Sequence, residues 1–283
     1  MPVIAAFKDV LKRHRKSVRR ALVRRFYRFT ADDLADGLRR LGIREGDSLL
    51  VHSSFNRLEG FLGRPTDIIA TIAKVVGPTG HVLMPTLPFA GSAVNYVASA
   101  PVFDVRRTPS RTGLLTELFR RQPGVVRSVH PTHAVCVSGP RSRSFVEGHH
   151  LAKTPCGRPS PYSRLLDEKG KILLLGTGIG ALTFYHFVEE DLEPFLPFPI
   201  FTPQTFTLRS IGYAGEELVT ETRLFDPLTS TQRRMPRIIP HLKARRMWQA
   251  RRIGSVATIL LSAEDIYLVS LELAAKGTHF YDR

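Results

Sequence analysis

The segment from residue 183 to residue 189 carries side chains of the types that perform acid–base chemistry. Thr183, His186 and Glu189 stand three residues apart, and residues at that spacing are neighbours on a helix. A carboxylate beside an imidazole can hold it in one tautomer and make it a better base. More acids follow, and they would attract a protonated amine: Glu190, Asp191 and Glu193. A solvated acidic helix end with a structural histidine would give the same pattern, so both interpretations stand.

Two other segments place polar residues where predicted strands end. His52, Ser53 and Ser54 close one apolar run, and Thr86 closes another. Ligands of open α/β sheets bind at the carboxyl ends of strands. Hydroxyls and backbone N–H groups there could hold an amide chain or a thioester carbonyl. Taken alone, each segment is only a strand end.

Three further chemistries have weaker support. His130 and His133 flank a proline that breaks the helical spacing of a zinc pair, so no metal is expected. Cys136 or Cys156 could start a ping-pong acyl transfer, but nothing around either thiol marks it as activated. The glycines of Gly176–Gly180 follow the pattern G-x-G-x-G rather than G-x-G-x-x-G. We therefore reject a nicotinamide or flavin site and predict a tight strand-to-helix turn.

The elements that must position these residues alternate along the chain. Thr30 is a helix cap with acids in the first turn, and Gly42 ends that helix. The apolar patterns predict strands and helices in alternation, followed by a β segment at 205–222 and a helical C-terminal region. The strands are expected near 47–52, 81–86, 133–137 and 171–175, and the helices near 66–76 and 113–121. This alternation is typical of an α/β fold, and we predict a single layered α/β domain over residues 30–283.

The net charge of +16 is concentrated in two segments. Residues 1–28 hold ten Lys or Arg and one Asp, and residues 233–252 hold eight Lys or Arg and no acid. The rest of the chain is close to neutral. Basic segments can contact nucleic acid, anionic lipid or a phosphorylated small molecule, but no nucleic-acid-binding motif accompanies them.

Apolar residues recur at helical spacing between the charges of residues 1–29, which predicts a basic amphipathic helical arm. Such a helix could lie on an anionic membrane surface, or its apolar stripe could pack on the domain or on a second subunit of a homo-oligomer. The chain shows no signal-peptide pattern and no run long enough to span a membrane. With only two cysteines, we expect a cytoplasmic protein, with attachment to the membrane periphery as the alternative.

Taken in order, these segments resemble the family of aminoglycoside 3-N-acetyltransferases. The resemblance covers roughly residues 30–230, and each piece is short while the ordered set is specific. The matching pieces are residues 41–54, 77–86, 108–110, 127–131, 160–161, 173–176 and 183–189.

The resemblance implies an enzyme that moves an acetyl group from acetyl-coenzyme A to an amine on a sugar, by direct transfer without an acyl-enzyme. It implies that His186 is the general base and that an acid farther along, for which Asp226 is the candidate, orients it; Glu189 is the second catalytic carboxylate. Thr183 and Glu190 are expected at the acceptor. The residues expected at the coenzyme are His52, Ser53, Ser54, Thr86, Arg127, Ser128 and His130.

Two features depart from the pattern of enzymes that acetylate polycationic antibiotics. Residues 87–102 contain no acid, and a basic protein repels polycations at long range. We therefore expect a neutral or anionic amino sugar as acceptor, such as a nucleotide-linked or cell-surface glycan precursor. The alternatives are an aminoglycoside-resistance acetyltransferase, the use of another acyl-coenzyme A, and a non-catalytic protein that binds a membrane or polyanion through its basic arms.

Overall fold

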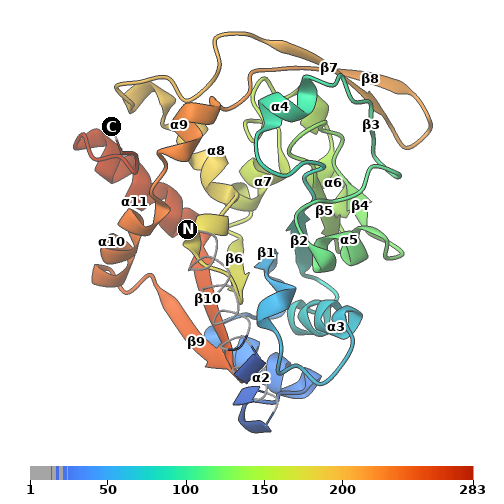
Figure 1. The fold of residues 1–283 in the computed structure, drawn as a ribbon, viewed down its shortest axis with the longest axis vertical. Coiled ribbons are helices and arrows are strands. Elements are labelled where there is room, and N and C mark those ends of the chain that lie inside the picture. Colours follow the sequence, from blue (N-terminus) through green and yellow to red (C-terminus); the bar gives the residue numbers. More distant parts are fainter. Residues whose placement is uncertain (1–13, 15–16, 19–21, 24, 283) are drawn as a thin grey trace.

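A seven-stranded sheet forms the centre of the computed structural model, which describes residues 14, 17–18, 22–23 and 25–282 (Figure 1). The strand order is β4-β5-β2-β1-β6-β10-β9. β1 pairs in parallel with β2 and with β6, whereas the outer strands pair antiparallel. The strands are β1 (Ser48–Ser53), β2 (His81–Pro85), β4 (Val126–Arg127), β5 (Val135–Ser138), β6 (Lys171–Leu175), β9 (Gln249–Ile253) and β10 (Val256–Ser262).

Helices cover both faces of this sheet because successive strand residues point to opposite sides. Leu50 and Leu174 face one apolar cluster, which includes α6 (Ser142–Val146), α7 (Pro161–Asp167), α8 (Phe184–Asp191), α10 (Ile239–Ala244) and α11 (Ala263–Ala275). Leu49 and Leu173 face the other cluster, which includes α2 (Ala31–Leu41), α3 (Pro65–Val76) and α5 (Leu114–Arg120). In Figure 1, α3 lies on one side of the central strands and α11 on the other. The layered α/β class expected from the sequence is confirmed.

The helix ends follow the capping residues of the sequence. Thr30 and Asp33 form a capping box at the start of α2, and Gly42 closes that helix at a φ of 115°, a conformation that glycine adopts without a steric cost. α3 begins with Pro65 in its first turn and ends at Gly77. The predicted boundaries of these elements agree with the structure to within one or two residues.

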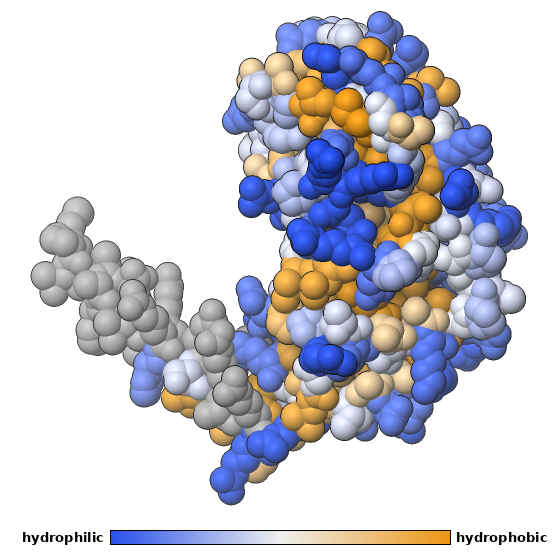
Figure 2. Space-filling view, turned by 90° about the vertical axis from the view of Figure 1, so that its right-hand side faces the viewer, coloured by the Kyte–Doolittle hydropathy of each residue, from blue (hydrophilic) through white to orange (hydrophobic). Residues whose placement is uncertain are grey.

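A second, three-stranded sheet covers the carboxyl end of the first. Its order is β3-β7-β8, formed by β3 (Phe103–Asp104), β7 (Phe206–Ile211) and β8 (Glu217–Thr222). α4 (Ala93–Val97) packs on it through Ala93 and Val97, which contact Leu208 and Leu224. α9 (Pro227–Thr231) follows β8. The face shown in Figure 2 mixes hydrophilic and apolar residues.

Two sequence expectations need comment. The C-terminal region is not wholly helical, because β9 and β10 form an antiparallel pair that completes the main sheet. Most of the arm 1–29 lies outside the described residues, so its helix stays a prediction; Phe29, which we assigned to the arm, is buried against Phe61 in the core. Among the described residues, none of the helices combines the length and apolar character that a membrane crossing requires.

Candidate functional site

The carboxyl ends of β1 and β6 lie side by side and border one of two clefts, and the helix that follows β6 contributes to the other. Ser53 is in register with Leu175, and the backbone N–H of Ser54 donates to the carbonyl of Leu175 at 3.1 Å. The chain after β1 enters one cleft at Ser54. The chain after β6 borders the same cleft and then continues through a 3₁₀ turn into α8, whose His186 lines the second cleft.

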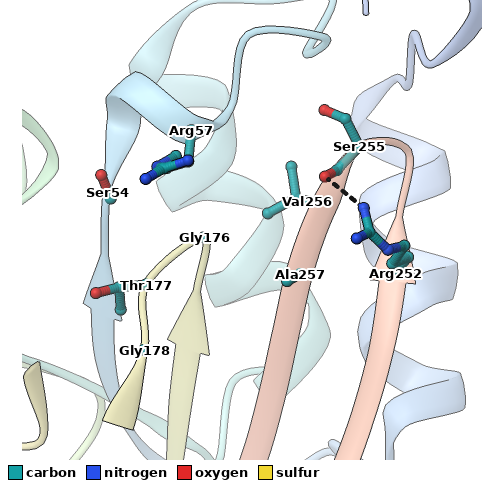
Figure 3. A pocket seen from close by; sticks show the side chains of 9 residues that line it. All are labelled: Ser54, Arg57, Gly176, Thr177, Gly178, Arg252, Ser255, Val256 and Ala257. Atoms are coloured by element: carbon teal, nitrogen blue, oxygen red, sulfur yellow. Dashed lines mark hydrogen bonds between the residues drawn. The ribbon is translucent and has the colours of Figure 1, made fainter. Parts of the chain in front are cut away.

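The first cleft, here called the arginine cleft, has a volume of about 470 Å³ and is lined by Ser54, Arg57, Gly176, Thr177, Gly178, Arg252, Ser255, Val256 and Ala257. Arg57 and Arg252 come from opposite sides of the end of β6 (Figure 3). Arg252 Nη1 donates to the carbonyl of Ser255 at 3.4 Å. The lining contains two guanidinium groups and no carboxylate, so this cleft is suited to an anion.

The glycine turn shapes the floor of the arginine cleft. Gly176 has a φ of 68°, and a Cβ at this position would lie 3.0 Å from the Cβ of Arg57. A Cβ at Gly178 would meet nothing within 4 Å, so that residue borders open space. A turn of small residues beside arginines lets a ligand approach the backbone N–H groups closely, as anion sites require.

The second cleft, here called the histidine cleft, has a volume of about 450 Å³. Its polar groups are the imidazoles of His133 and His186, the Arg233 guanidinium, and three hydroxyls. The remaining lining is largely apolar, and the full set is Leu87, Phe89, Gly91, Ser92, Ala93, His133, His186, Phe225, Pro227, Ser230, Thr231 and Arg233. An apolar cleft with a few convergent polar groups is typical of a small-molecule site.

His186 and Glu189 meet on α8, as the three-residue spacing predicted. His186 Nδ1 lies 2.8 Å from Glu189 Oε1, and Glu189 is fully buried. Burial lowers the pKa of His186, the hydrogen bond to Glu189 opposes this, and Arg233 lowers the pKa further, so the net shift is downward. Burial alone would raise the pKa of Glu189, but Arg233 and His186 outweigh it and hold the pKa below its ordinary value. The two shifts together leave a neutral His186 imidazole beside an ionised Glu189 carboxylate.

Two more histidines approach His186. The ring centroid of His133 lies 5.8 Å from that of His186, and His133 Nδ1 contacts the Thr132 hydroxyl at 3.0 Å. His52, on β1, is 6% exposed, and its Nε2 is buried without a partner among the described residues. Burial, with a smaller contribution from His186, lowers the pKa of His52 to about 3. Within the described residues, no three His, Cys, Asp or Glu side chains are grouped so as to hold a metal ion.

Four residues expected at the coenzyme are hydrogen-bonded within the protein, so their role at the coenzyme stays a prediction. Arg127 is 2% exposed and donates to the Thr86 hydroxyl at 3.0 Å and to backbone carbonyls. The Ser128 hydroxyl accepts from the Val135 N–H at 2.9 Å and contacts His149 Nδ1 at 2.8 Å. His130 Nδ1 accepts the N–H groups of the following turn. These side chains join β4, β5 and the covering loops, and they line neither cleft.

The other expected residues are placed as follows. Ser54 lines the arginine cleft, and Ser53 is the last residue of β1. Glu190 turns away from the histidine cleft, because its oxygens accept from the Thr154 hydroxyl at 2.6 Å and the Cys156 N–H at 2.9 Å. The hydroxyl oxygen of Thr183 is buried directly before α8. Asp226 caps α9 by accepting from the Thr229 N–H at 2.7 Å, so Glu189 is the carboxylate that holds His186.

Sequence reasoning missed four residues: three that line the clefts and one that contacts Glu189 from outside them. Arg57 stands three residues after Ser54, which was a usable signal. Arg252 and Arg233 were counted only as part of a basic segment. The structure shows that Arg233 forms a buried ion pair with Glu189 at 2.7 Å. Tyr281 also reaches Glu189, from the end of the chain, and nothing in the local pattern indicates it.

Comparisons with known proteins identify the family and the fold. A family model described as aminoglycoside 3-N-acetyltransferase matches residues 50–274. The aminoglycoside N(3)-acetyltransferase III of Salmonella sp is 31% identical over 172 residues, which cover 56% of this chain and 60% of that protein. The matched region thus spans about three fifths of the length of that relative.

Solved structures share the fold over most of the chain. The aminoglycoside acetyltransferase AAC(3)-IVa, solved as the apoenzyme, has a TM-score of 0.73 at 25% identity and matches over 90% of this chain and 92% of its own. AAC-IIIb, solved as a binary complex with coenzyme A, has a TM-score of 0.72 at 24% identity and matches over 90% and 98%.

Proposed function

The chain belongs to the aminoglycoside 3-N-acetyltransferase family, and from this premise we propose that it transfers an acetyl group from acetyl-coenzyme A to the amine of an amino sugar. Two clefts carry the proposal: the arginine cleft at the ends of β1 and β6, and the histidine cleft, which is lined by His186 of the helix that follows β6. One cleft offers cations to a phosphorylated donor. The other holds a histidine–carboxylate pair suited to deprotonating an amine.

The arginine cleft is the proposed site for the phosphate groups of the donor. Arg57 and Arg252 are both exposed, and guanidinium groups form strong, directional hydrogen bonds with phosphate oxygens. The Ser54 and Thr177 hydroxyls and the glycine turn supply neutral donors beside them. AAC-IIIb, which shares the fold, was solved with coenzyme A, and this supports the use of a coenzyme A donor by this chain.

Replacing Arg57 and Arg252 together by alanine should raise the Kd for acetyl-coenzyme A by about 100-fold or more, because each of the two lost hydrogen bonds to a charged group contributes about 1.5–3 kcal/mol. Calorimetric titration at physiological salt would measure this. Arg107→Ala is the matched control, because its side chain is 91% exposed and it lies in neither cleft. Unchanged affinity in the double variant would place the coenzyme elsewhere.

His186 is the proposed general base. Its Nδ1 is hydrogen-bonded to Glu189, so Nε2 is the nitrogen left to accept a proton from the acceptor amine. The amine nitrogen then forms a bond to the thioester carbonyl carbon, and the carbon–sulfur bond breaks. The imidazolium returns its proton to the leaving thiolate, which restores the neutral base. The lowered pKa of His186 keeps the imidazole unprotonated at neutral pH.

The lining of the histidine cleft supports an acceptor that is not a polycation. The lining contains no carboxylate, and its one cation, Arg233, is paired with the buried Glu189. A polycation would therefore find hydroxyls and aromatic rings but no counter-charge at the lining. We propose a neutral or anionic amino sugar. The names of the relatives favour a second candidate, an aminoglycoside acetylated at its 3-amino group.

A panel of acceptors should separate the two candidates. We expect kcat/KM for a nucleotide-linked or single-ring amino sugar to exceed that for gentamicin by about tenfold or more, because unpaired charges in the cleft are penalised. Thiol release from acetyl-coenzyme A measures both. If gentamicin is turned over equally fast or faster, the acceptor is the second candidate, an aminoglycoside.

A further inference from the structure

The last residues of the chain return to the helix that carries His186. Tyr281 pairs with Arg233 in an isolated β-bridge, and the Asp282 N–H donates to the carbonyl of Gln232 at 2.9 Å. Arg237 and Arg234 both form ion pairs with the Asp282 carboxylate. The C-terminal segment 280–282 is therefore fastened beside the segment that follows α9.

Four hydrogen bonds converge on the buried carboxylate of Glu189. Oε1 accepts from His186 Nδ1 at 2.8 Å and from Arg233 Nη2 at 2.7 Å. Oε2 accepts from Arg233 Nε at 2.7 Å and from the Tyr281 hydroxyl. Glu189 and Tyr281 are each no more than 1% exposed, so water does not compete for these bonds.

From this geometry we infer that Tyr281 and Arg233 are positioning residues, which fix Glu189 so that one oxygen is held against His186. The inference rests on the proposed role of His186 as base. It makes catalysis depend on the segment 280–282, which lies outside both clefts. Because Tyr281 lines neither cleft, it acts only through Glu189.

The charges around His186 determine at which pH its imidazole becomes protonated. Glu189 on α8 favours the protonated imidazole, and Arg233, from the segment after α9, opposes it. His133, before β5, and His52, on β1, also face His186, and burial keeps both neutral. Without the Tyr281 hydroxyl, Oε2 would keep only its bond to Arg233. The carboxylate would then become a stronger acceptor toward His186, whose protonation would move to higher pH.

Tyr281→Phe tests the inference because it removes the hydroxyl and keeps the ring that packs on Phe198. We expect kcat/KM to fall about tenfold, the loss typical of one hydrogen bond to a charged group, and the acid limb of its pH profile to move to higher pH. NMR titration of the His186 imidazole should show the same direction without turnover. That readout keeps the test separate from the proposed function, whose failure would remove activity in the wild type as well.

Tyr267→Phe is the matched control. The Tyr267 hydroxyl donates to Asp191 Oδ2 at 3.1 Å on the same helix, but it does not contact Glu189. Arg233→Lys provides a second variant, which keeps the cation and loses the bidentate geometry, and it should shift the imidazole titration in the same direction. If Tyr281→Phe titrates and turns over as the Tyr267→Phe and wild-type proteins do, the inference is wrong.

Discussion

His186→Ala should lower kcat for acetyl transfer by about 10²- to 10⁴-fold, the range that general base catalysis contributes. Among the residues that line the histidine cleft, His186 is hydrogen-bonded through Nδ1 to the buried Glu189 carboxylate, and its Nε2 is left to accept a proton. Without it, the amine proton has no acceptor when the carbon–nitrogen bond forms. Thiol release at saturating acetyl-coenzyme A measures the loss.

The affinity of the same variant for acetyl-coenzyme A should stay unchanged, because His186 lies outside the arginine cleft. His241→Ala, a substitution on α10 away from both clefts, should keep the kcat of the wild type. A His186→Ala protein that retains more than a tenth of wild-type kcat would exclude it as the base.

Acidification from pH 7 to pH 5 should destabilise the fold by several kcal/mol. Burial lowers the pKa of His52 and of His149 to about 3, whereas an exposed histidine titrates near 6.5. Below pH 6.5 these two imidazoles therefore bind protons in the unfolded chain but stay neutral in the folded chain. The stability that these two neutral histidines contribute is fully present above pH 6.5, and it is lost as the pH falls toward 3. At pH 5 each histidine contributes a loss of about 2 kcal/mol.

His130 and His133 act in the same direction, because burial lowers their pKa as well. Glu190 acts in the opposite direction, since burial raises its pKa and its protonation favours the folded state. The contributions of the other groups are the same in the wild type and in a His149→Asn variant, so they cancel when the two proteins are compared. Urea unfolding at both pH values should show a loss for the variant that is about 2 kcal/mol smaller than for the wild type. Equal losses would contradict the assigned protonation of His149.

The features predicted well from sequence are the local ones. His186 and Glu189 meet because three residues on one helix bring them together, and α2 ends where its glycine allows a positive φ. Arg127, expected at the coenzyme because of the family resemblance, stays a prediction; the structure buries its guanidinium against Thr86 and Phe103.

The parts that escaped prediction depend on distant segments. Arg233 and Tyr281 reach Glu189 across 44 and 92 residues of chain, and no local pattern encodes such a meeting. β9 was missed because four of its five residues are exposed at the sheet edge, two of them arginines, which hides the alternation that marks a half-buried strand. Arg252 could not be assigned to a cleft until β9 was placed beside β10.

The most direct test of the account is amine-dependent thiol release from acetyl-coenzyme A, followed with wild-type protein and His186→Ala over one panel of amino sugars. The account predicts saturable release by the wild type that requires both an amine acceptor and His186, with the acetyl group recovered on the acceptor by mass spectrometry. Release that needs no acceptor, or that His186→Ala supports at the wild-type rate, would contradict direct transfer with His186 as base.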